Sequence, residues 1–459
     1  MTEYSDFIAS KRVFVPASPV RHAETSSLLF PFQREIVDWA LARGRAAIFA
    51  DTGLGKTLME LEWARHVAQH GRVLIFAPLA VAPQTVREGL RFGIGVRYAL
   101  DQADAGDARI VITNYERLEH FDLRAFVGVV LDESSILKSF MGKTKRALVD
   151  RCSSVRWRLA CTATPAPNDH LELGNHAEFL GVMTSHEMIA RWFLPDTSTF
   201  GTYRLKGHGI EPFWDWVASW AVCIARPSDL GYDDAGYILP DLHRIPHTVE
   251  VDTSTDTGGE LFRTPDLSAT GLHKEKRRTV DARAAKVNEL VRAEKHETWL
   301  VWCDTDYEAD ALLEVLPKKG TVEVRGSHTR EKKERAALGF VDGRIRALVS
   351  KPSIFGWGLN FQHCARQAFV GTSYSYEAFY QAVRRSWRFG QKREVDAHVV
   401  MASTEVALWA VLNAKRDGHE EMRGQMSAAM RRARAKASPR AVYAPEREME
   451  VPRWLRSVA

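Results

Sequence analysis

The sequence has 459 residues, 45% hydrophobic and 26% charged, an ordinary composition for a folded chain that excludes one dominated by disordered sequence. Its formal net charge of +5 is mildly basic, which is compatible with nucleic acid as a partner but does not establish it. It lacks the run of about 18 apolar residues that a membrane helix needs, and its N-terminus does not resemble a secretion signal. Its five cysteines are scattered and do not have the paired spacing of a zinc site. We therefore expect a reduced, cytoplasmic protein without a membrane span.

The first part of the chain alternates short apolar runs with helix-like stretches. Residues 45–50, RAAIFA, predict a buried strand, and the next segment has an apolar face at helical spacing, formed by Leu58, Leu61, Ala64 and Val67. Further apolar runs begin at residues 73, 109, 127 and 157. Continuous apolar strands that alternate with helices predict a doubly wound parallel sheet in an α/β lobe.

A second series of apolar runs follows at residues 298–303, 321–326, 346–351, 367–372 and 397–402. We therefore predict two α/β lobes in tandem. We set an N-terminal extension at residues 1–27, the first lobe at 28–245, a linker at 246–282, the second lobe at 283–422 and a basic tail at 423–459. The linker prediction rests on residues 252–271, which are rich in Gly, Ser, Thr and Asp.

Two segments allow more than one interpretation. The region at about 170–240 is predicted to be helical and carries tryptophans at 192, 214, 216 and 220, which could stack on bases, although we favour packing against the first lobe. The tail is either a solvated helix with a disordered end or a nucleic-acid-binding arm. Its basic residues are Arg423, Arg431, Arg432, Arg434, Lys436 and Arg440, with no acid between 422 and 445.

Residues 50–57, ADTGLGKT, predict a phosphate-binding loop between a strand and a helix. Gly53 and Gly55 let the backbone approach a phosphate, and successive backbone N–H groups with the N-terminus of the following helix attract anions. Lys56 would reach the β- and γ-phosphates, and the Thr57 hydroxyl would ligate Mg²⁺. Ala50 stands where the common pattern has Gly, which suits a loop whose first residue need only be small. We also place Thr52 among the nucleotide-binding residues.

An acidic pair follows another buried strand, in the stretch VVLDESS at residues 129–135. Asp132 would hold Mg²⁺, and Glu133 is placed to orient and deprotonate the attacking water. Such a pair alone is often a solvated strand end. Together with the phosphate loop it indicates a site for nucleotide hydrolysis.

With these motifs the chain resembles a superfamily 2 helicase-type ATPase, over about residues 28–420, and most resembles the Swi/Snf-like branch in its short stand-alone bacterial and phage form. The resemblance implies two RecA-like lobes with an ATP cleft between them. Gln33, in LLFPFQREIVDWAL, would recognise adenine. VLIFAPLAVAPQTVREG and VITNYERL resemble nucleic-acid-facing motifs, with Pro78, Thr113 and Asn114 as the matching residues. TATPAPND resembles the motif that couples the nucleotide site to lobe movement, through Thr162 and Thr164.

The second lobe carries the remaining motifs of this resemblance. GWGLNFQHC, at residues 356–364, resembles the motif near the interlobe cleft and places Gly358 at the nucleotide. QAVRRSWRFGQ, at residues 381–391, resembles the arginine-finger motif. The matching residues are Gln381, Arg385, Arg388 and Gln391. Gln381 would contact the nucleotide, and Arg385 and Arg388 would act in catalysis with Lys56 and Glu133. The chain departs from its relatives at Ser134, Ser135, Arg384 and Trp387, where Ala, His, Gly and His are common.

The resemblance implies an ATP- and Mg²⁺-dependent motor that moves on DNA, with double-stranded DNA favoured and RNA left open. A strand-separating or branch-migration helicase is one alternative, and a nucleotide-dependent DNA clamp with little turnover is another. We expect a monomer, in the cytoplasm of a bacterial cell or encoded by a phage. The tail could bind a protein partner.

Overall fold

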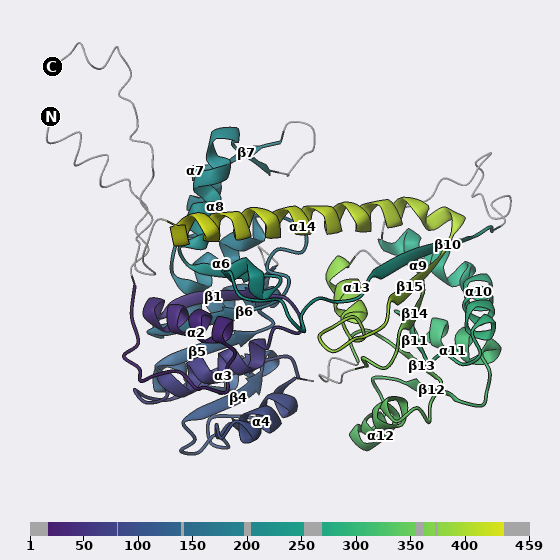
Figure 1. Ribbon diagram of the computed structural model, residues 1–459, viewed down its shortest axis with the longest axis horizontal. Coiled ribbons are helices and arrows are strands. Elements are labelled where there is room, and N and C mark those ends of the chain that lie inside the picture. Colours follow the sequence, from purple (N-terminus) through teal and green to yellow (C-terminus); the bar gives the residue numbers. More distant parts are fainter. Residues whose placement is uncertain are drawn as a thin grey trace, which may run out of the picture.

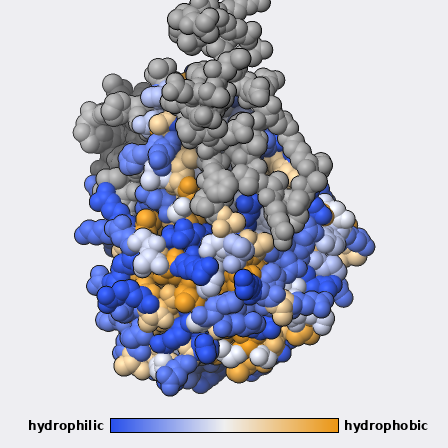
Figure 2. Space-filling view, turned by 90° about the vertical axis from the view of Figure 1, so that its left-hand side faces the viewer, coloured by the Kyte–Doolittle hydropathy of each residue, from blue (hydrophilic) through white to orange (hydrophobic). Residues whose placement is uncertain are grey.

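The computed structural model describes residues 17–79, 81–138, 142–196, 203–251, 269–354, 361–371 and 375–435. These residues fold into two α/β lobes that lie side by side, and one long C-terminal helix runs across both (Figure 1). In the face drawn in Figure 2, hydrophobic side chains lie in several small areas between hydrophilic ones. No helix in the described ranges is long and apolar enough to cross a bilayer.

The first lobe is built on a seven-stranded sheet with the order β3-β4-β2-β5-β6-β1-β9. All of its strand pairs are parallel, and the order reverses direction within the sheet, as a doubly wound fold requires. The strands are β1 (Arg45–Ala50), β2 (Val73–Ala77), β3 (Arg97–Tyr98), β4 (Ile110–Asn114), β5 (Gly128–Asp132), β6 (Trp157–Cys161) and β9 (Ala221–Ile224). The five strands predicted for this lobe are confirmed, whereas β3 and β9 were not predicted.

The helices of the first lobe are α2 (Pro31–Arg43), α3 (Lys56–Val67), α4 (Ala82–Arg91), α5 (Lys143–Cys152), α6 (Glu172–Leu180), α7 (Ser185–Trp192) and α8 (Ile210–Ala218). A small antiparallel hairpin, β7 (Phe193–Pro195) with β8 (Tyr203–Leu205), projects beside α7 (Figure 1). The tryptophans of this region are buried: Trp192, Trp214, Trp216 and Trp220 all belong to the hydrophobic core of the first lobe. The packing interpretation of this cluster is therefore confirmed.

The second lobe contains a six-stranded parallel sheet with the order β10-β15-β14-β11-β13-β12. Its strands are β10 (Leu242–Val249), β11 (Trp299–Trp302), β12 (Thr321–Val324), β13 (Ala347–Ser350), β14 (Arg366–Val370) and β15 (Val395–Ala402). Its helices are α9 (Ala269–Arg278), α10 (Val280–Ala293), α11 (Asp306–Val315), α12 (Arg330–Val341) and α13 (Tyr376–Val383). The tandem α/β architecture is thus confirmed. The boundary placed at residue 245 falls inside β10, which pairs with β15 at the edge of the second sheet.

The C-terminal helix α14 (Val406–Ala435) connects the two lobes. Leu412, near its start, packs in a core of the second lobe, whereas Met422, Met426 and Met430 pack in the core of the first. The backbone N–H of Cys223 in β9 also donates to the Met430 sulfur at 3.0 Å. The boundary placed at residue 423 therefore falls inside a docked helix, and residues 252–268 and 436–459 of the linker and tail lie outside the described residues.

Candidate nucleotide site

The predicted phosphate loop joins the end of β1 to the start of α3. Gly53 and Gly55 have φ angles of 95° and 80°, in the left-handed region that glycine adopts without a steric penalty. A Cβ atom on Gly55 would also lie 2.4 Å from the side-chain nitrogen of Gln33. The loop therefore requires glycine at this position for two reasons, and its backbone N–H groups lead directly into the N-terminus of α3.

Lys56 and Gln33 both contact the backbone of this loop. The Lys56 ammonium group donates to the carbonyl oxygen of Ala50 at 2.9 Å. Gln33, buried on α2, donates from Nε2 to the Leu54 carbonyl oxygen at 2.8 Å and accepts at Oε1 from the Phe30 N–H at 2.9 Å. The carboxamide retains a second donor and a second lone pair, so it still has groups that can pair with a base. Thr52 and Thr57 are partly exposed in the same loop.

The acidic pair lies at the carboxyl end of β5, two strands from the phosphate loop in the sheet. Asp132 is buried, and its Oδ2 atom has no hydrogen-bond partner among the described residues. Burial, followed by the charge of Glu133, raises the pKa of Asp132 to about 7. An unsatisfied buried carboxylate oxygen is a ligand of the kind that Mg²⁺ prefers, so the donor set fits this ion.

Glu133 has a backbone conformation that is uncommon for a residue with a side chain. Its φ angle is +54°, the one positive φ among the described residues other than glycine. Such a conformation costs of order 1 kcal/mol or more and occurs preferentially at functional sites. Thr162, just after β6, donates from its hydroxyl to the Glu133 carboxylate at 3.3 Å and accepts from the Thr164 N–H at 3.1 Å. The Thr164 hydroxyl is buried without a partner in the described part of the chain.

We did not single out Glu60 from the sequence, although it lies one helical turn after Lys56 on α3. It is fully buried, and burial together with the charge of Asp132 raises its pKa well above the usual range. A carboxyl that remains protonated beside Asp132 limits the negative charge buried under the loop. The spacing of four residues between Lys56 and Glu60, which places both on one face of α3, was the available signal.

The two candidate arginine fingers follow α13 in the second lobe and approach the first. Burial lowers the pKa of Arg385, and the nearby charge of Glu133 partly offsets this effect. Burial and then Arg385 lower the pKa of Arg388 to about 10, and its Nε atom has no partner in the described ranges. Arg384, just before them, donates from Nη2 to the Thr52 carbonyl oxygen at 2.6 Å, so this segment of the second lobe reaches the phosphate loop of the first.

The remaining predicted residues differ in their placement. Gln381 is partly exposed on α13, and Gly358 lies outside the described residues. Gln391 is buried, and its side chain binds the backbone that follows it, since its Oε1 atom accepts from the N–H groups of Lys392 and Arg393, both at 2.9 Å.

The residues expected to face nucleic acid follow β2 and end β4. Pro78 is partly exposed, whereas Thr113 and Asn114 are buried. Thr113 donates to the Ala99 carbonyl oxygen at 2.8 Å, and Asn114 donates to Glu116 at 2.9 Å. The side chains of Thr113 and Asn114 are thus engaged inside the lobe.

Comparison with known proteins agrees with this arrangement. Residues 30–173 match the DEAD/DEAH box helicase family, and residues 282–390 match the helicase conserved C-terminal domain. The first match contains the phosphate loop, the acidic pair and Thr162, and the second contains Arg385 and Arg388.

Among curated proteins, the chain is similar to the SWI/SNF-related matrix-associated actin-dependent regulator of chromatin subfamily A-like protein 1 of Bos taurus. It is 24% identical over 441 residues, which cover 85% of this chain and 44% of that protein. The human DNA annealing helicase and endonuclease ZRANB3 is 21% identical over 447 residues, which cover 84% of this chain and 40% of that protein. The chain thus spans less than half the length of these relatives.

Among solved structures, the chain is similar to the Sulfolobus solfataricus SWI2/SNF2 ATPase core in complex with dsDNA. The TM-score is 0.42 at 16% identity, with 91% of this chain and 97% of that chain covered.

Two parallel α/β lobes in tandem, with a phosphate loop and an acidic pair in one and an arginine-bearing segment of the other in contact with that loop, define the class of two-lobed helicase-type ATPases. This chain belongs to helicase superfamily 2, in its Swi/Snf-like branch.

Proposed function

We propose that this protein is a motor that hydrolyses ATP between its two lobes in order to move along DNA, with double-stranded DNA as the favoured track. The observation that carries the proposal is that the arginine-bearing segment of the second lobe reaches the phosphate loop of the first, since Arg384, next to Arg385, donates from Nη2 to the Thr52 carbonyl oxygen at 2.6 Å. When the groups that complete a nucleotide site lie on separate lobes, binding favours lobe closure and hydrolysis releases it. Repeated closure and release can drive stepping along a polymer.

Binding of ATP is assigned to the first lobe in this proposal. The backbone N–H groups from Gly53 to Thr57 surround the phosphates, and Lys56 exchanges the Ala50 carbonyl oxygen for phosphate oxygens. Gln33 recognises adenine with its free hydrogen-bonding capacity, while Thr52, Gln381 and Gly358 remain proposed nucleotide contacts. Thr57 and Asp132 would hold Mg²⁺, which supplies positive charge to the phosphates when bound.

Hydrolysis is assigned to groups from both lobes. Glu133 accepts a proton from the attacking water, and its hydrogen bond with the Thr162 hydroxyl keeps the carboxylate oriented. Arg385 and Arg388 stabilise the negative charge on the transferring phosphoryl group. Because Thr162 and Thr164 follow β6 and Thr162 contacts Glu133, they are suited to couple hydrolysis to lobe movement.

Contacts with DNA are supported by less direct observations. The human relative is named a DNA annealing helicase, and the family membership is consistent with a nucleic acid track. Contacts to backbone phosphates would allow movement without reading sequence. Pro78 is accessible for such a contact, whereas Thr113 and Asn114 would act by shaping the loops that follow β4.

The decisive experiment is the steady-state ATPase rate without nucleic acid and with single-stranded DNA, double-stranded DNA or RNA. Stimulation by duplex DNA that is lost in Arg388→Ala would support the proposal. Stimulation by single strands or RNA alone would contradict the duplex track. A rate near zero despite ATP binding would favour a clamp.

A strand-separating helicase is the second candidate, because the β7–β8 hairpin projects from the first lobe (Figure 1). A projecting hairpin can act as a wedge between strands. The test is unwinding of a fluorescent forked duplex with and without deletion of residues 194–204. Unwinding that the deletion abolishes, with ATPase activity retained, would favour this candidate.

We also propose that the protein works as a monomer in the cytoplasm. The observation that supports the monomer is that one chain supplies both the phosphate loop and the arginine-bearing segment that contacts it. Measurement of molar mass in solution by light scattering, with and without DNA, tests the monomer.

A further inference from the structure

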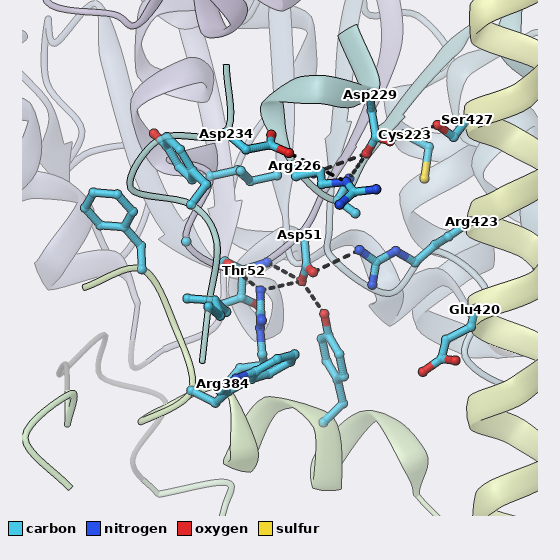
Figure 3. A pocket seen from close by; sticks show the side chains of 18 of the residues that line it. Asp51, Thr52, Cys223, Arg226, Asp229, Asp234, Arg384, Glu420, Arg423 and Ser427 are labelled. Carbon is cyan, nitrogen blue, oxygen red and sulfur yellow. Dashed lines mark hydrogen bonds and ion pairs between the residues drawn. The ribbon is translucent and has the colours of Figure 1, made fainter. Parts of the chain in front are cut away.

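One carboxylate of the phosphate loop, that of Asp51, is held by side chains from the second lobe and from α14 (Figure 3). Asp51 is buried, and its Oδ1 atom accepts from the Thr52 N–H at 2.6 Å and forms an ion pair with Arg384 at 3.0 Å. Its Oδ2 atom forms an ion pair with Arg423 at 2.9 Å. The Tyr380 hydroxyl also donates to Oδ1.

These partners come from two helices that are neighbours in space but are not consecutive elements in the sequence. Tyr380 lies on α13, Arg384 caps that helix, and Arg423 lies on α14. Burial alone would raise the pKa of Asp51, but the charges of Arg384 and Arg423 outweigh it and hold the pKa well below the usual range. The carboxylate is therefore ionised and paired, and removing a partner would leave a buried charge unpaired.

Arg384 makes a second contact, with the backbone of the phosphate loop. Its Nη2 atom donates to the carbonyl oxygen of Thr52 at 2.6 Å, so it binds both the side chain and the backbone of the loop. The next residue is Arg385, whose pKa is lowered by burial and partly restored by the charge of Glu133. One residue of the second lobe thus contacts the phosphate loop, and the residue after it is influenced by the charge of the acidic pair.

The cluster is accessible from a pocket of about 610 Å³ between the lobes, which is also lined by Arg226, Arg244 and Arg431. The ion pairs of Asp51 therefore lie at the boundary of the lobes, where a change in how the lobes meet would alter them.

We propose that Asp51 and Arg384 form a positioning pair that fixes the end of α13 against the phosphate loop and thereby sets Arg385 and Arg388 for hydrolysis. This inference rests on the proposed ATPase function. Arg423 extends the same contact to α14, and through it to the docking of that helix.

The test compares Asp51→Asn and Arg384→Gln with Arg384→Lys as the conservative variant and Arg434→Gln as the matched control. Arg434 also joins α14 to the first lobe, through an ion pair with Glu35 at 3.3 Å, but it does not contact the loop. We expect kcat to fall about 10- to 100-fold in the first two variants, the effect of losing one charged hydrogen bond, with ATP affinity within about threefold. Arg384→Lys should retain part of the activity and Arg434→Gln all of it.

Hydrogen exchange at residues 51–57 and 384–388 gives a second readout that does not require turnover. We expect faster exchange in Asp51→Asn and Arg384→Gln, and no change in Arg434→Gln. Wild-type kcat and unchanged exchange in the first two variants would overturn the positioning pair. A fall in ATP affinity that matches the fall in kcat would also overturn it, because the pair would then serve binding. Absence of turnover in the wild type would refute the proposed function, and the exchange data would still decide the inference.

Discussion

Ser135, which lies two residues after Glu133 in the first lobe, donates a hydrogen bond of 2.5 Å to Glu377 of the second lobe. The other oxygen of Glu377 accepts from Lys138 at 2.7 Å. The departure from the family pattern at Ser135 therefore forms a direct link between the lobes. Because this link follows Glu133, whose φ angle is positive, it is placed to hold the turn that carries the proposed catalytic base in position.

Ser135→Ala should lower kcat by about 10-fold with little change in ATP affinity, since it removes one hydrogen bond to a carboxylate. The measurement is DNA-stimulated ATPase activity together with nucleotide binding. Ser185→Ala is the matched control, because Ser185 is also buried and donates to a carboxylate, Glu178, at 2.8 Å within the first lobe. Equal rates for the wild type and Ser135→Ala would show that the link has no catalytic role.

Glu133→Gln should abolish turnover while ATP binding is kept. The amide cannot accept the proton of the attacking water, but it has nearly the same shape as the carboxylate. Single-turnover hydrolysis and fluorescent nucleotide binding measure the two properties separately. Normal hydrolysis by this variant would mean that another group acts as the base.

Met426→Ala should lower the free energy of unfolding by about 2–4 kcal/mol, because it leaves a cavity in the core of the first lobe. The Met426 side chain is 1% exposed, whereas Val411 on the same helix is 40% exposed. Val411→Ala is therefore the control, with an expected change below about 0.5 kcal/mol. Urea unfolding followed by tryptophan fluorescence measures both, and equal effects would contradict the docking of α14.

His419 should make the protein less stable as the pH falls from about 6.5 to about 4. Burial and then Arg423 lower its pKa to about 4, the charge of Asp51 partly offsets this effect, and its ring packs near those of Tyr376 and Tyr380. In this interval the unfolded chain binds the proton and the folded chain does not, so unfolding is favoured by up to about 1.4 kcal/mol per pH unit.

The measurement for His419 is the difference in urea midpoint between the wild type and His419→Phe across this interval. The variant removes the titrating group and should lose less stability on acidification. Parallel curves for the two proteins would exclude a contribution from this residue.

Truncation after residue 435 should show whether the basic residues beyond α14 contribute to DNA binding, because it keeps the basic residues of α14 itself. We expect the truncated protein to fold, because α14 keeps its contacts with the first lobe. If residues 436–459 bind phosphates, the slope of DNA affinity against salt concentration will become shallower by about one for each lost contact. An unchanged slope would exclude a DNA-binding role for this segment.

The central strands could be predicted from the sequence because their burial on both faces leaves a plain signal. β1 and β5 are continuous apolar runs, and both were found. β10 is an edge strand with alternating exposure and a proline at position 246, so its sequence resembles a linker.

Within the candidate site, sequence motifs predicted residues that are close in the chain better than contacts across the lobes. The phosphate loop and the acidic pair were recognisable, but the Asp51–Arg384 and Ser135–Glu377 contacts depend on how the lobes meet. The docking of α14 did leave a signal, since Met422, Met426 and Met430 repeat every four residues. The many basic residues around them directed the interpretation toward a tail.

The chain passes between the lobes twice, once from β9 to β10 and once through α14, whose two ends pack in different cores. Two connections restrict the relative movement of the lobes more than one connection would. Because the two ends of α14 pack in different cores, a rotation of one lobe against the other would change the side-chain contacts of this helix with at least one of them. We therefore expect opening to weaken these contacts and closure to restore them, so that α14 favours the arrangement of the lobes described above.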